Sequence, residues 1–491
     1  MLRDRFIPGL WVRLQSDIHA APMIPPSPEQ ISPGTRRAAI VMTMLSSVAT
    51  AMMLSTVNVA LPSIAAALKM DAVTLSWVPM AYLLASAACV LSLARLADMF
   101  GRRRIFLWGT VGVVLASVIA ACADSTAVLL CARALQGASA AALFATQIAI
   151  ISSVYPPAKR GAAIGATISA VYIGLSLGPL LGGRVIEMFS WRAAFLPHLP
   201  LTLVVLYLCL RHMRFEWRDA ERGVFDAVGA LLYAIGIMVL MVGLASLPST
   251  HGVLMLAGGA VLLWMFFRYE RRHAHPIFDV ELFYTNRVFT LSCLASLVMY
   301  TTTFANVMLV SLYLQYLKDV PPSRAGLIMM TQPLVMAIFS PIAGRLSDRV
   351  EPRVIASLGM ALTALGLAGF ALLDAHSALS STAICLAICG FGFSLFSSPN
   401  VNAIMGAVPP KDYSRASGAM SVMRVMGQLT SMGLVAVVMG FWLGPVAIEP
   451  AVYERLGHAI ATCFASGALL SALGIALSLS RGRMHRPAAT S

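Results

Sequence analysis

Few residues in this chain could do chemistry within its long apolar segments, and Arg133 is the clearest of them. The segment 129–137 places its permanent cation in an otherwise apolar stretch. If this stretch crosses a bilayer, the charge is costly unless it is paired or faces water, so we interpret Arg133 as a functional residue. The alternative is that its side chain reaches out to the nearby membrane surface.

Uncharged polar residues in other apolar segments are candidates to line a substrate cavity. They are Asn58, Tyr82, Gln147, Asn306 and Asn400. Such side chains either line a pathway or form hydrogen bonds with neighbouring helices, and the pattern does not decide between the two roles.

Two charged turns of similar sequence interrupt the apolar segments. The first, at 93–104, contains Asp98, Gly101, Arg102 and Arg103. The second, at 343–353, places Asp348 at 250 residues after the first aspartate, with Arg349 beside it. Because the arrangement recurs, we expect a cytoplasmic latch whose Asp–Arg contacts form in one conformation and break in another. The alternative is a basic loop that only fixes orientation.

A glycine-rich stretch at 174–183 contains Gly174, Gly178, Pro179, Gly182 and Gly183. Glycine at every fourth position gives a helix a smooth face that another helix can approach closely, and the proline favours a bend. We expect a hinge here, and a general packing face is the alternative.

The elements that position these residues must be membrane-spanning helices. Of the 491 residues, 59% are hydrophobic and 11% are charged, and the mean hydropathy of +0.81 is too high for a soluble globular protein. Apolar runs of roughly twenty residues, enough to cross a bilayer as helices, recur from residue 38 almost to the end. Alternating strand-like segments, the pattern of a β-barrel, are absent. The sequence therefore predicts an all-α membrane protein.

We place fourteen spans between boundaries marked by charges, proline or glycine. They run near 38–62, 74–94, 105–123, 127–150, 162–184, 193–210, 227–247, 252–268, 288–314, 325–343, 354–373, 379–405, 416–442 and 457–480. Six spans form an N-terminal bundle (38–211) and six a C-terminal bundle (288–480). The region 212–287 contributes a charged loop, two inserted helices and a connector. We expect a mobile cytoplasmic tail at 1–37 and a second tail at 481–491. Paired repeats of this kind commonly hold the substrate at mid-membrane between the halves.

The formal net charge of +14 follows the predicted topology. With a cytoplasmic N-terminus, 27 of the 35 Lys and Arg residues fall in inner tails and loops and six in outer loops, while Arg133 and Arg424 lie inside spans. This asymmetry predicts that both termini are cytoplasmic and gives no reason to expect a nucleic-acid partner. The eight cysteines lie in apolar runs without a clustered histidine or acid, so we expect no metal site and no cofactor.

Several of these motifs together resemble the major facilitator superfamily. They are the run 58–62, the turn 93–104, the segment 133–137, Gly178-Pro179 with Gly182-Gly183, and Ser190-Trp191-Arg192. The span count and the connector 276–283 resemble its fourteen-helix drug:proton antiporter branch, the EmrB/QacA type.

The resemblance implies a major facilitator fold with two six-helix bundles and two inserted central helices. It implies export of small amphiphilic molecules, drugs among them, by alternating access driven by the proton motive force across a bacterial inner membrane. It also implies that Asp98, Arg102 and Arg103 belong to the latch and that Arg133 takes part in proton coupling. Gly174, Gly178, Pro179 and Gly182 would then form the antiporter hinge.

The chain departs from the family pattern where protons matter. Many relatives carry an aspartate in the first span where this chain has Met53, and an asparagine where it has His198. No Asp or Glu lies in the central part of a predicted span, although a proton-coupled exporter needs an intramembrane carboxylate or histidine. We therefore expect coupling through His198, Glu187 or the substrate's own proton. Arg133 and Arg424 favour neutral or weakly acidic substrates over permanent cations.

Other functions remain open from the sequence. One is export of a single endogenous metabolite such as a siderophore, and another is a sensor or scaffold that does not transport. The chain has no phosphate-binding loop, no His-Glu-x-x-His helix and no nucleophile elbow, so we expect no enzyme. The expected partners are a small-molecule substrate, protons and the lipid bilayer. Relatives in double-membrane bacteria often work with a periplasmic adaptor and an outer-membrane channel, which the short outer loops neither require nor exclude.

Overall fold

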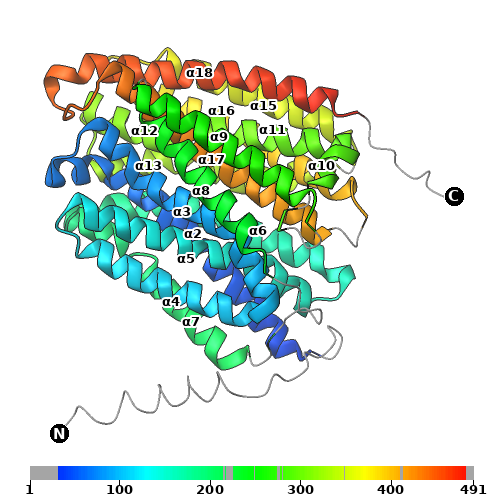
Figure 1. Cartoon of the computed structure of the whole chain (residues 1–491). Coiled ribbons are helices and arrows are strands. Elements are labelled where there is room, and N and C mark those ends of the chain that lie inside the picture. The colour runs from blue at the N-terminus through cyan, green and yellow to red at the C-terminus, as the bar shows by residue number, and fades with distance from the viewer. Residues whose placement is uncertain are drawn as a thin grey trace, which may run out of the picture.

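The chain forms one bundle of long helices packed side by side, with the helices of the N-terminal half grouped on one side and those of the C-terminal half on the other (Figure 1). The computed structural model describes residues 31–213, 216, 225–247, 249–273, 277–278, 280–347, 349–409 and 413–482. Within these residues there is no strand, and fourteen helical segments are long and apolar enough to cross a membrane. The predicted all-α membrane fold with fourteen spans is therefore confirmed.

The N-terminal half holds six spans and the middle of the chain two. The N-terminal elements are α2 (Pro33–Leu68), α3 (Ala72–Phe100), α4 (Arg102–Ala121), α5 (Thr126–Val154), α6 (Pro157–Met188), the 3₁₀ helix η1 (Trp191–Phe195) and α7 (Leu199–His212). The inserted pair is α8 (Ala227–Ala245) and α9 (Thr250–Glu270), followed by the short α10 (Glu281–Thr285).

The C-terminal half holds the remaining six spans. Its elements are α11 (Arg287–Thr303), α12 (Asn306–Leu312), the π-helix η2 (Tyr313–Leu317), α13 (Pro322–Met329), α14 (Thr331–Ser347), α15 (Pro352–Ala371), α16 (Leu379–Gly406), α17 (Tyr413–Trp442), the 3₁₀ helix η4 (Pro450–Val452) and α18 (Tyr453–Ser480). Two predicted spans are interrupted. The span 288–314 is divided between α11 and α12, and the span 325–343 is divided between α13 and α14.

The predicted end of the N-terminal tail at residue 37 is wrong. α2 begins at Pro33, because proline is favoured in the first helical turn and the Ser32 hydroxyl accepts a hydrogen bond from Thr35 N at 3.2 Å. Residues 1–30 of the predicted tail lie outside the described part of the chain.

The C-terminal tail also begins later than predicted. Arg481, which we had assigned to the tail, is 2% exposed. Its Nη1 donates to Asn400 Oδ1 at 2.7 Å and to Ser292 Oγ at 3.1 Å. The residue therefore ties the end of α18 to α16 and α11.

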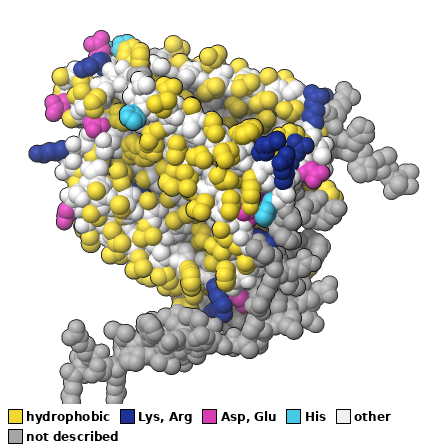
Figure 2. All heavy atoms as spheres, in the orientation of Figure 1, with side chains coloured by type: hydrophobic (Ala, Val, Ile, Leu, Met, Phe, Trp, Pro, Cys, Tyr) yellow, Lys and Arg dark blue, Asp and Glu magenta, His cyan; other side chains and the backbone are white. Residues whose placement is uncertain are grey.

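The inserted helices α8 and α9 lie on the outside of the bundle (Figure 1). α8 packs against α9, against α3 of the N-terminal half and against α17 of the C-terminal half. The outer side of the pair is apolar, with Leu254 65% and Trp264 63% exposed. Figure 2 shows this broad apolar face, with Lys and Arg side chains gathered where α8 begins and α9 ends. This distribution suits helices that face lipid and end at a charged surface.

The two halves contact each other at one end of the bundle. This end carries the loops 69–71, 318–321 and 443–449; the charge pattern predicts that it faces outward, and we call it the outer end. Gln315 Nε2 donates to Val59 O at 3.0 Å, and Ala72 N donates to Val446 O at 3.2 Å. The opposite end, which carries the turn at 101, is called the inner end. The halves are thus closed together at the outer end.

Candidate transport and coupling site

Arg133 is fully buried in α5, with an exposed fraction of 0%. Its Nε donates to Val78 O of α3 at 3.0 Å, and its Nη1 donates to Gln136 Oε1 at 2.7 Å. The alternative that Arg133 extends to the membrane surface is therefore wrong. Its guanidinium lies within the N-terminal bundle.

A chain of hydrogen bonds joins Arg133 to His198. Gln136 Nε2 donates to Ser117 Oγ at 2.8 Å, and Ser117 Oγ lies 2.9 Å from His198 Nε2. His198 is 1% exposed and is the residue before α7. The structure thus brings together two residues, 65 positions apart in the sequence, that we had selected separately. We call Arg133, Gln136, Ser117 and His198 the relay.

The relay can hold a proton in two positions. Ser117 Oγ lies 2.7 Å from Val113 O as well as 2.9 Å from His198 Nε2. A hydroxyl carries one proton, so Ser117 donates either to the carbonyl or to the imidazole. In the first case His198 Nε2 carries the hydrogen of the shared bond, and in the second it accepts. The tautomer of His198 is thus linked to the Ser117 hydroxyl.

Tyr82 lies beside the relay. The Arg133 Cζ is 4.7 Å from the centroid of the Tyr82 ring, a cation–π contact. Two polar atoms here are buried without a hydrogen-bond partner: Arg133 Nη2 and Tyr82 Oη. No acidic side chain among the described residues pairs with Arg133. The site therefore carries a buried positive charge with donor capacity still unused.

A second cation within the spans, Arg424 of α17, lies against an aromatic ring of the other half. Its Cζ lies 5.8 Å from the centroid of the Phe144 ring in α5. Tyr172 Oη and Ser397 Oγ, one from each half, lie 3.2 Å apart. Aromatic and polar side chains of the two halves therefore meet at this interface.

Glu187 does not join the relay. Its side chain is exposed near the outer end of α6, and no hydrogen bond or ion pair connects it to Arg133 or His198. Arg133 and His198 therefore belong to one hydrogen-bonded chain, and Glu187 lies outside it.

The first charged turn is held by contacts within the N-terminal half. Asp98 Oδ1 accepts from Arg102 Nη2 at 2.9 Å, and Arg102 Nη1 donates to Ser153 Oγ of α5 at 2.9 Å. Asp348 of the second turn lies outside the described residues, and Arg349 is exposed. The latch can therefore be described only for its first copy.

Glu216 is a member of this turn that the sequence analysis missed. Its Oε1 accepts from Arg103 N at 2.9 Å, at the N-terminus of α4. A Cβ atom at Gly101, whose φ is 116°, would collide with the Glu216 side chain. Burial raises the pKa of the Glu216 carboxyl, while the backbone donors of Arg104 and Arg103 oppose that shift. The only signal in the sequence was an acid within a basic loop, more than a hundred residues from its partners.

The glycines of α6 face two different neighbours. A Cβ at Gly174 would lie 2.9 Å from Ala51 Cβ, and a Cβ at Gly182 would lie 2.6 Å from Thr56 Cγ2, both in α2. Gly178 faces Ser55 and Met52 of the same helix. Gly183 instead faces Pro322 of the C-terminal half, and Pro179 O faces Gly326 of α13. The segment 174–183 therefore touches α2 and the other half at once.

The five cavity candidates do not converge on one site. Gln147 accepts from Ser47 Oγ at 3.2 Å and donates to Ser46 Oγ at 2.8 Å. Asn58 Nδ2 donates to Leu54 O within α2 at 3.2 Å, and Asn400 is bound to Ser296 and Arg481. Gln147 and Asn400 therefore hold helices together, Asn58 bonds only within its own helix, and Tyr82 lies at the relay.

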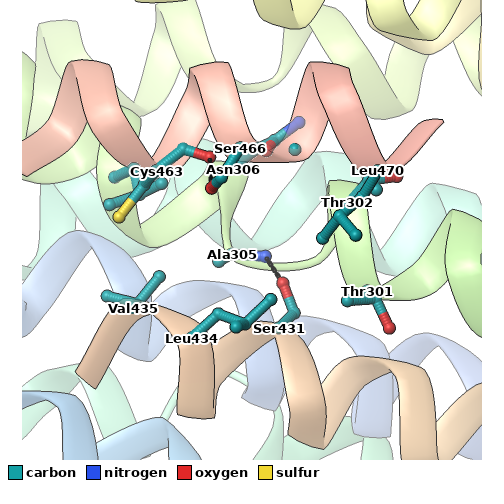
Figure 3. Close-up of a pocket in the computed structure, with 12 residues that line it drawn as sticks. Thr301, Thr302, Ala305, Asn306, Ser431, Leu434, Val435, Cys463, Ser466 and Leu470 are labelled. Carbon is teal, nitrogen blue, oxygen red and sulfur yellow. Dashed lines mark hydrogen bonds between the residues drawn. The ribbon is translucent and has the colours of Figure 1, made fainter. Parts of the chain in front are cut away.

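Asn306 lines a small cavity at the break between α11 and α12 (Figure 3). Ala305 N donates to Ser431 Oγ at 3.0 Å, which replaces a helical hydrogen bond lost at the break. The cavity, of about 20 Å³, has room for about one water molecule. Figure 3 shows Ser466 and Cys463 of α18 on the opposite side from Ser431 of α17. All of its lining residues belong to the C-terminal half, so this cavity does not place Asn306 at the interface between the halves.

Comparisons with known proteins agree with this architecture. The profile of the family described as the Major Facilitator Superfamily matches residues 43–432 and 291–489. The chain is 32% identical over 400 residues to the multidrug resistance protein Stp of Mycobacterium tuberculosis, covering 80% of this chain and 74% of Stp. It is 30% identical over 370 residues to the riboflavin transporter RibZ of Clostridioides difficile, covering 75% and 81%. It is 30% identical over 396 residues to the drug efflux pump JefA of Mycobacterium tuberculosis, covering 79% and 77%.

Solved structures share the fold. A peptide transporter POT in complex with sulfate matches with a TM-score of 0.69 at 14% identity, covering 95% of this chain and 98% of that one. A bacterial homologue of the human lysosomal transporter Spinster, in an inward-facing and occupied conformation, matches with a TM-score of 0.65 at 14% identity, covering 92% and 97%. At this identity the likeness concerns the fold alone.

Proposed function

The chain belongs to the Major Facilitator Superfamily, and on that premise we propose that it exports small amphiphilic molecules by alternating access, driven by the proton motive force. Membership makes it a transporter of small-molecule substrates, and fourteen spans make it a multi-pass membrane protein. Relatives named for multidrug resistance and drug efflux, at 32% and 30% identity over most of the chain, support export. Contact of the halves at the outer end is compatible with one of the two states that alternating access requires.

One observation carries the proposal about substrate: the internal charges between and within the halves are positive. Arg133 is buried with an unused donor, and Arg424 of the C-terminal half lies against Phe144 of the N-terminal half. A permanently cationic drug would find no anionic partner here among the described residues, whereas a weak acid would find two cations. We therefore assign neutral or weakly acidic aromatic amphiphiles to this transporter.

Proton coupling is assigned to the relay. His198 is the one group in the relay whose side chain is able both to accept and to release a proton, and Ser117 and Gln136 connect it to Arg133. A proton on His198 and an anionic substrate near Arg133 would then influence each other through this chain. Glu187 is a weaker candidate, because its side chain is exposed at the outer end of α6.

The proposed setting is a bacterial inner membrane with both termini in the cytoplasm. The distribution of Lys and Arg between alternate loops supports this orientation. The proposal requires neither a periplasmic adaptor nor an outer-membrane channel.

A narrower substrate range is the second candidate. The similarity to a protein named as a riboflavin transporter favours a single aromatic metabolite over many drugs. Competition separates the two: a multidrug exporter is inhibited by chemically diverse amphiphiles, whereas a dedicated one is inhibited only by close analogues of its substrate.

The test uses acidified everted vesicles that contain the protein and a pH-sensitive dye. A lipophilic cation, a neutral amphiphile and an aromatic weak acid are added in turn. We expect proton release with the neutral and acidic compounds, loss of that response in Arg133→Ala, and partial retention in Arg133→Lys, which keeps the charge but not the planar fork.

Strong proton release with the lipophilic cation alone would overturn the substrate assignment. Equal responses in the wild type and in Arg133→Ala would overturn the role of the relay. Silence with all three compounds in verified, inserted protein would favour the dedicated exporter or a non-transporting relative.

A further inference from the structure

Two acidic side chains meet at the inner end of the inserted helices. Asp226 is the residue before α8, and Glu270 is the last residue of α9. Their exposed fractions are 4% and 2%, and they are the only buried acidic side chains among the described residues. The sequence analysis singled out neither residue. Neither belongs to the relay.

One oxygen of each carboxylate is held by the surrounding structure. Asp226 Oδ1 accepts from Gly229 N at 2.9 Å, which caps α8, and from Tyr269 Oη at 3.1 Å. Glu270 Oε2 accepts from Phe278 N of the connector at 3.0 Å. These bonds fix both carboxylates at the junction of α8, α9 and the connector.

The other two oxygens face each other without a donor. Asp226 Oδ2 and Glu270 Oε1 are buried and have no hydrogen-bond partner. A Cβ atom at Gly229 would collide with both of them, so they converge on the same side of that glycine. Because both oxygens border that one position, they lie near each other. Asp226 Oδ2 and Glu270 Oε1 are thus two neighbouring acceptors, and a hydrogen bond between them requires that one of the two carboxyl groups carries a proton.

Among the described residues, the surrounding groups do not supply that donor. His273 Nε2 lies 3.9 Å from Asp226 Oδ2, beyond hydrogen-bonding distance, and its ring is stacked on Tyr269 at 5.2 Å. Two nearby cations stack on rings instead, with Arg268 over Trp264 at 5.9 Å and Arg271 over Tyr284 at 5.1 Å. No Lys or Arg in the described part of the chain, from α3 and α17 included, forms an ion pair with either carboxylate.

We propose that Asp226 and Glu270 form a proton-binding site in which one proton is shared between Asp226 Oδ2 and Glu270 Oε1. Two facing carboxylates cannot both be ionised at short range in a buried setting, and a shared proton replaces their repulsion with a strong O–H···O hydrogen bond. The single negative charge that remains is stabilised by Gly229 N at the positive end of α8, by Tyr269 and by Phe278 N.

The position of the site connects proton binding to both halves of the transporter. α8 packs against α3 and α17, one helix from each half, and the site closes the junction of α8 with α9. Figure 2 shows that Lys and Arg side chains gather on the surface at this end. Loss of the proton leaves two charges that push the ends of α8 and α9 apart. This inference does not depend on the substrate or on the coupling role of the relay.

The experiment is infrared spectroscopy of the purified full chain in lipid nanodiscs, which detects the carbonyl stretch of a protonated carboxylic acid. We expect such a band at neutral pH in the wild type, and its loss in Glu270→Gln and in Asp226→Asn, because each amide supplies an N–H donor and leaves its partner ionised. Asp374→Asn is the matched control. Asp374 accepts from Ser377 Oγ and from the backbone N–H groups of His376 and Ser377; these bonds lower its pKa, so it contributes no such band.

A second measurement follows apparent thermal unfolding against pH. The wild type should lose stability as the pH rises through the range in which the band disappears, and Glu270→Gln should not. Absence of the band from wild-type protein at neutral pH would overturn the proposal, and so would its persistence in both single variants. If one variant does not fold, the other still decides the outcome, because each replaces only one member of the pair.

Discussion

A buried arginine needs hydrogen-bond acceptors to remain charged, and the acceptors of Arg133 are all uncharged. Its partners are a backbone carbonyl, an amide oxygen and the face of Tyr82, with no carboxylate among them. Neutral partners satisfy these donors without cancelling the charge, so the positive field of Arg133 still acts on a substrate and on His198. Leaving one of these buried partners without its hydrogen bond costs about 1–3 kcal/mol.

His198→Asn should separate coupling from transport. Asparagine can keep a hydrogen bond with Ser117 but cannot carry a proton. We expect proton release in the everted-vesicle assay to fall sharply, while substrate binding, measured by quenching of tryptophan fluorescence, stays within a few-fold of the wild type. Ser117→Ala should show the same loss of proton release because it interrupts the relay. Unchanged proton release in both variants would remove His198 from the mechanism.

Glu216→Gln should change the pH dependence of stability. Burial raises the pKa of Glu216 above its ordinary value of 4.5, so the folded protein holds this proton more tightly than the unfolded chain does. The associated stability is present at low pH and is lost as the pH rises through the raised pKa. Glutamine keeps the acceptor for Arg103 N and cannot titrate.

The measurement for Glu216 is the apparent Tm in detergent, taken at pH values from about 4.5 upward, the range set by the direction of the pKa shift. We expect a flatter curve for Glu216→Gln than for the wild type. Glu187→Gln, at an exposed position of α6, is the matched control and should follow the wild type. Parallel curves for the wild type and Glu216→Gln would contradict the assignment.

At the scale of elements, α6 is a helix that packs closely against neighbours on two sides. Gly174, Gly178 and Gly182 let α2 approach on one side, while Pro179 and Gly183 meet α13 of the other half. A helix in contact with its own bundle and with the opposite bundle can transmit a movement between them. The glycines are required because backbone atoms, and not flexible side chains, limit much of the available space.

Gly178→Ala should be destabilising and Gly165→Ala should not. An added Cβ at 178 would collide with Ser55 and would lie 3.0 Å from Met52 O, and overpacking of this kind costs about 1–3 kcal/mol. Gly165, in the same helix, has nothing within 4 Å of an added Cβ, so alanine there should stabilise the helix by up to about 1 kcal/mol. Thermal unfolding and efflux rates of both variants test this contrast, and equal effects would show that α2 and α6 adapt without cost.

For the whole molecule, contact of the halves at the outer end is the feature that bears on alternating access. Asp71 and Ala447 form an isolated antiparallel bridge between the halves. Paired residues in such a bridge have Cα atoms about 4.5–5.5 Å apart, which is within the range of a disulfide. A bond at this position would hold the outer end closed.

The double variant Asp71→Cys with Ala447→Cys should lose transport on oxidation and recover it on reduction. Asp71 also caps α3 by accepting from Thr74 N at 2.7 Å, and loss of such a cap costs about 1 kcal/mol. Each single variant is therefore the control, because Asp71→Cys alone loses the cap without forming the cross-link. Full transport by the oxidised double variant would contradict opening at this end.

The sequence by itself determined the membrane class, the number of spans and the family. Those properties depend on the length and composition of local segments and on short motifs, which need no tertiary contacts to be read. Arg133 could also be selected from the sequence, because a charge in an apolar helix is conspicuous wherever it points. Helix ends were less certain, since capping by Ser32 and Asn286 extends α2 and α11 beyond the apolar core of each span.

Only the tertiary structure decided which polar residues act together. Gln147 and Asn400 look like Asn306 in the sequence, yet two of them hold helices together and the third lines a small cavity. Ser117 had no signal in the sequence and Gln136 stood out only as part of the segment 133–137, because a polar residue in a span gains a role only from the partner it meets. Asp226 and Glu270 lie 44 residues apart at two helix ends, and only the packing of α8 on α9 makes their unpaired oxygens face each other.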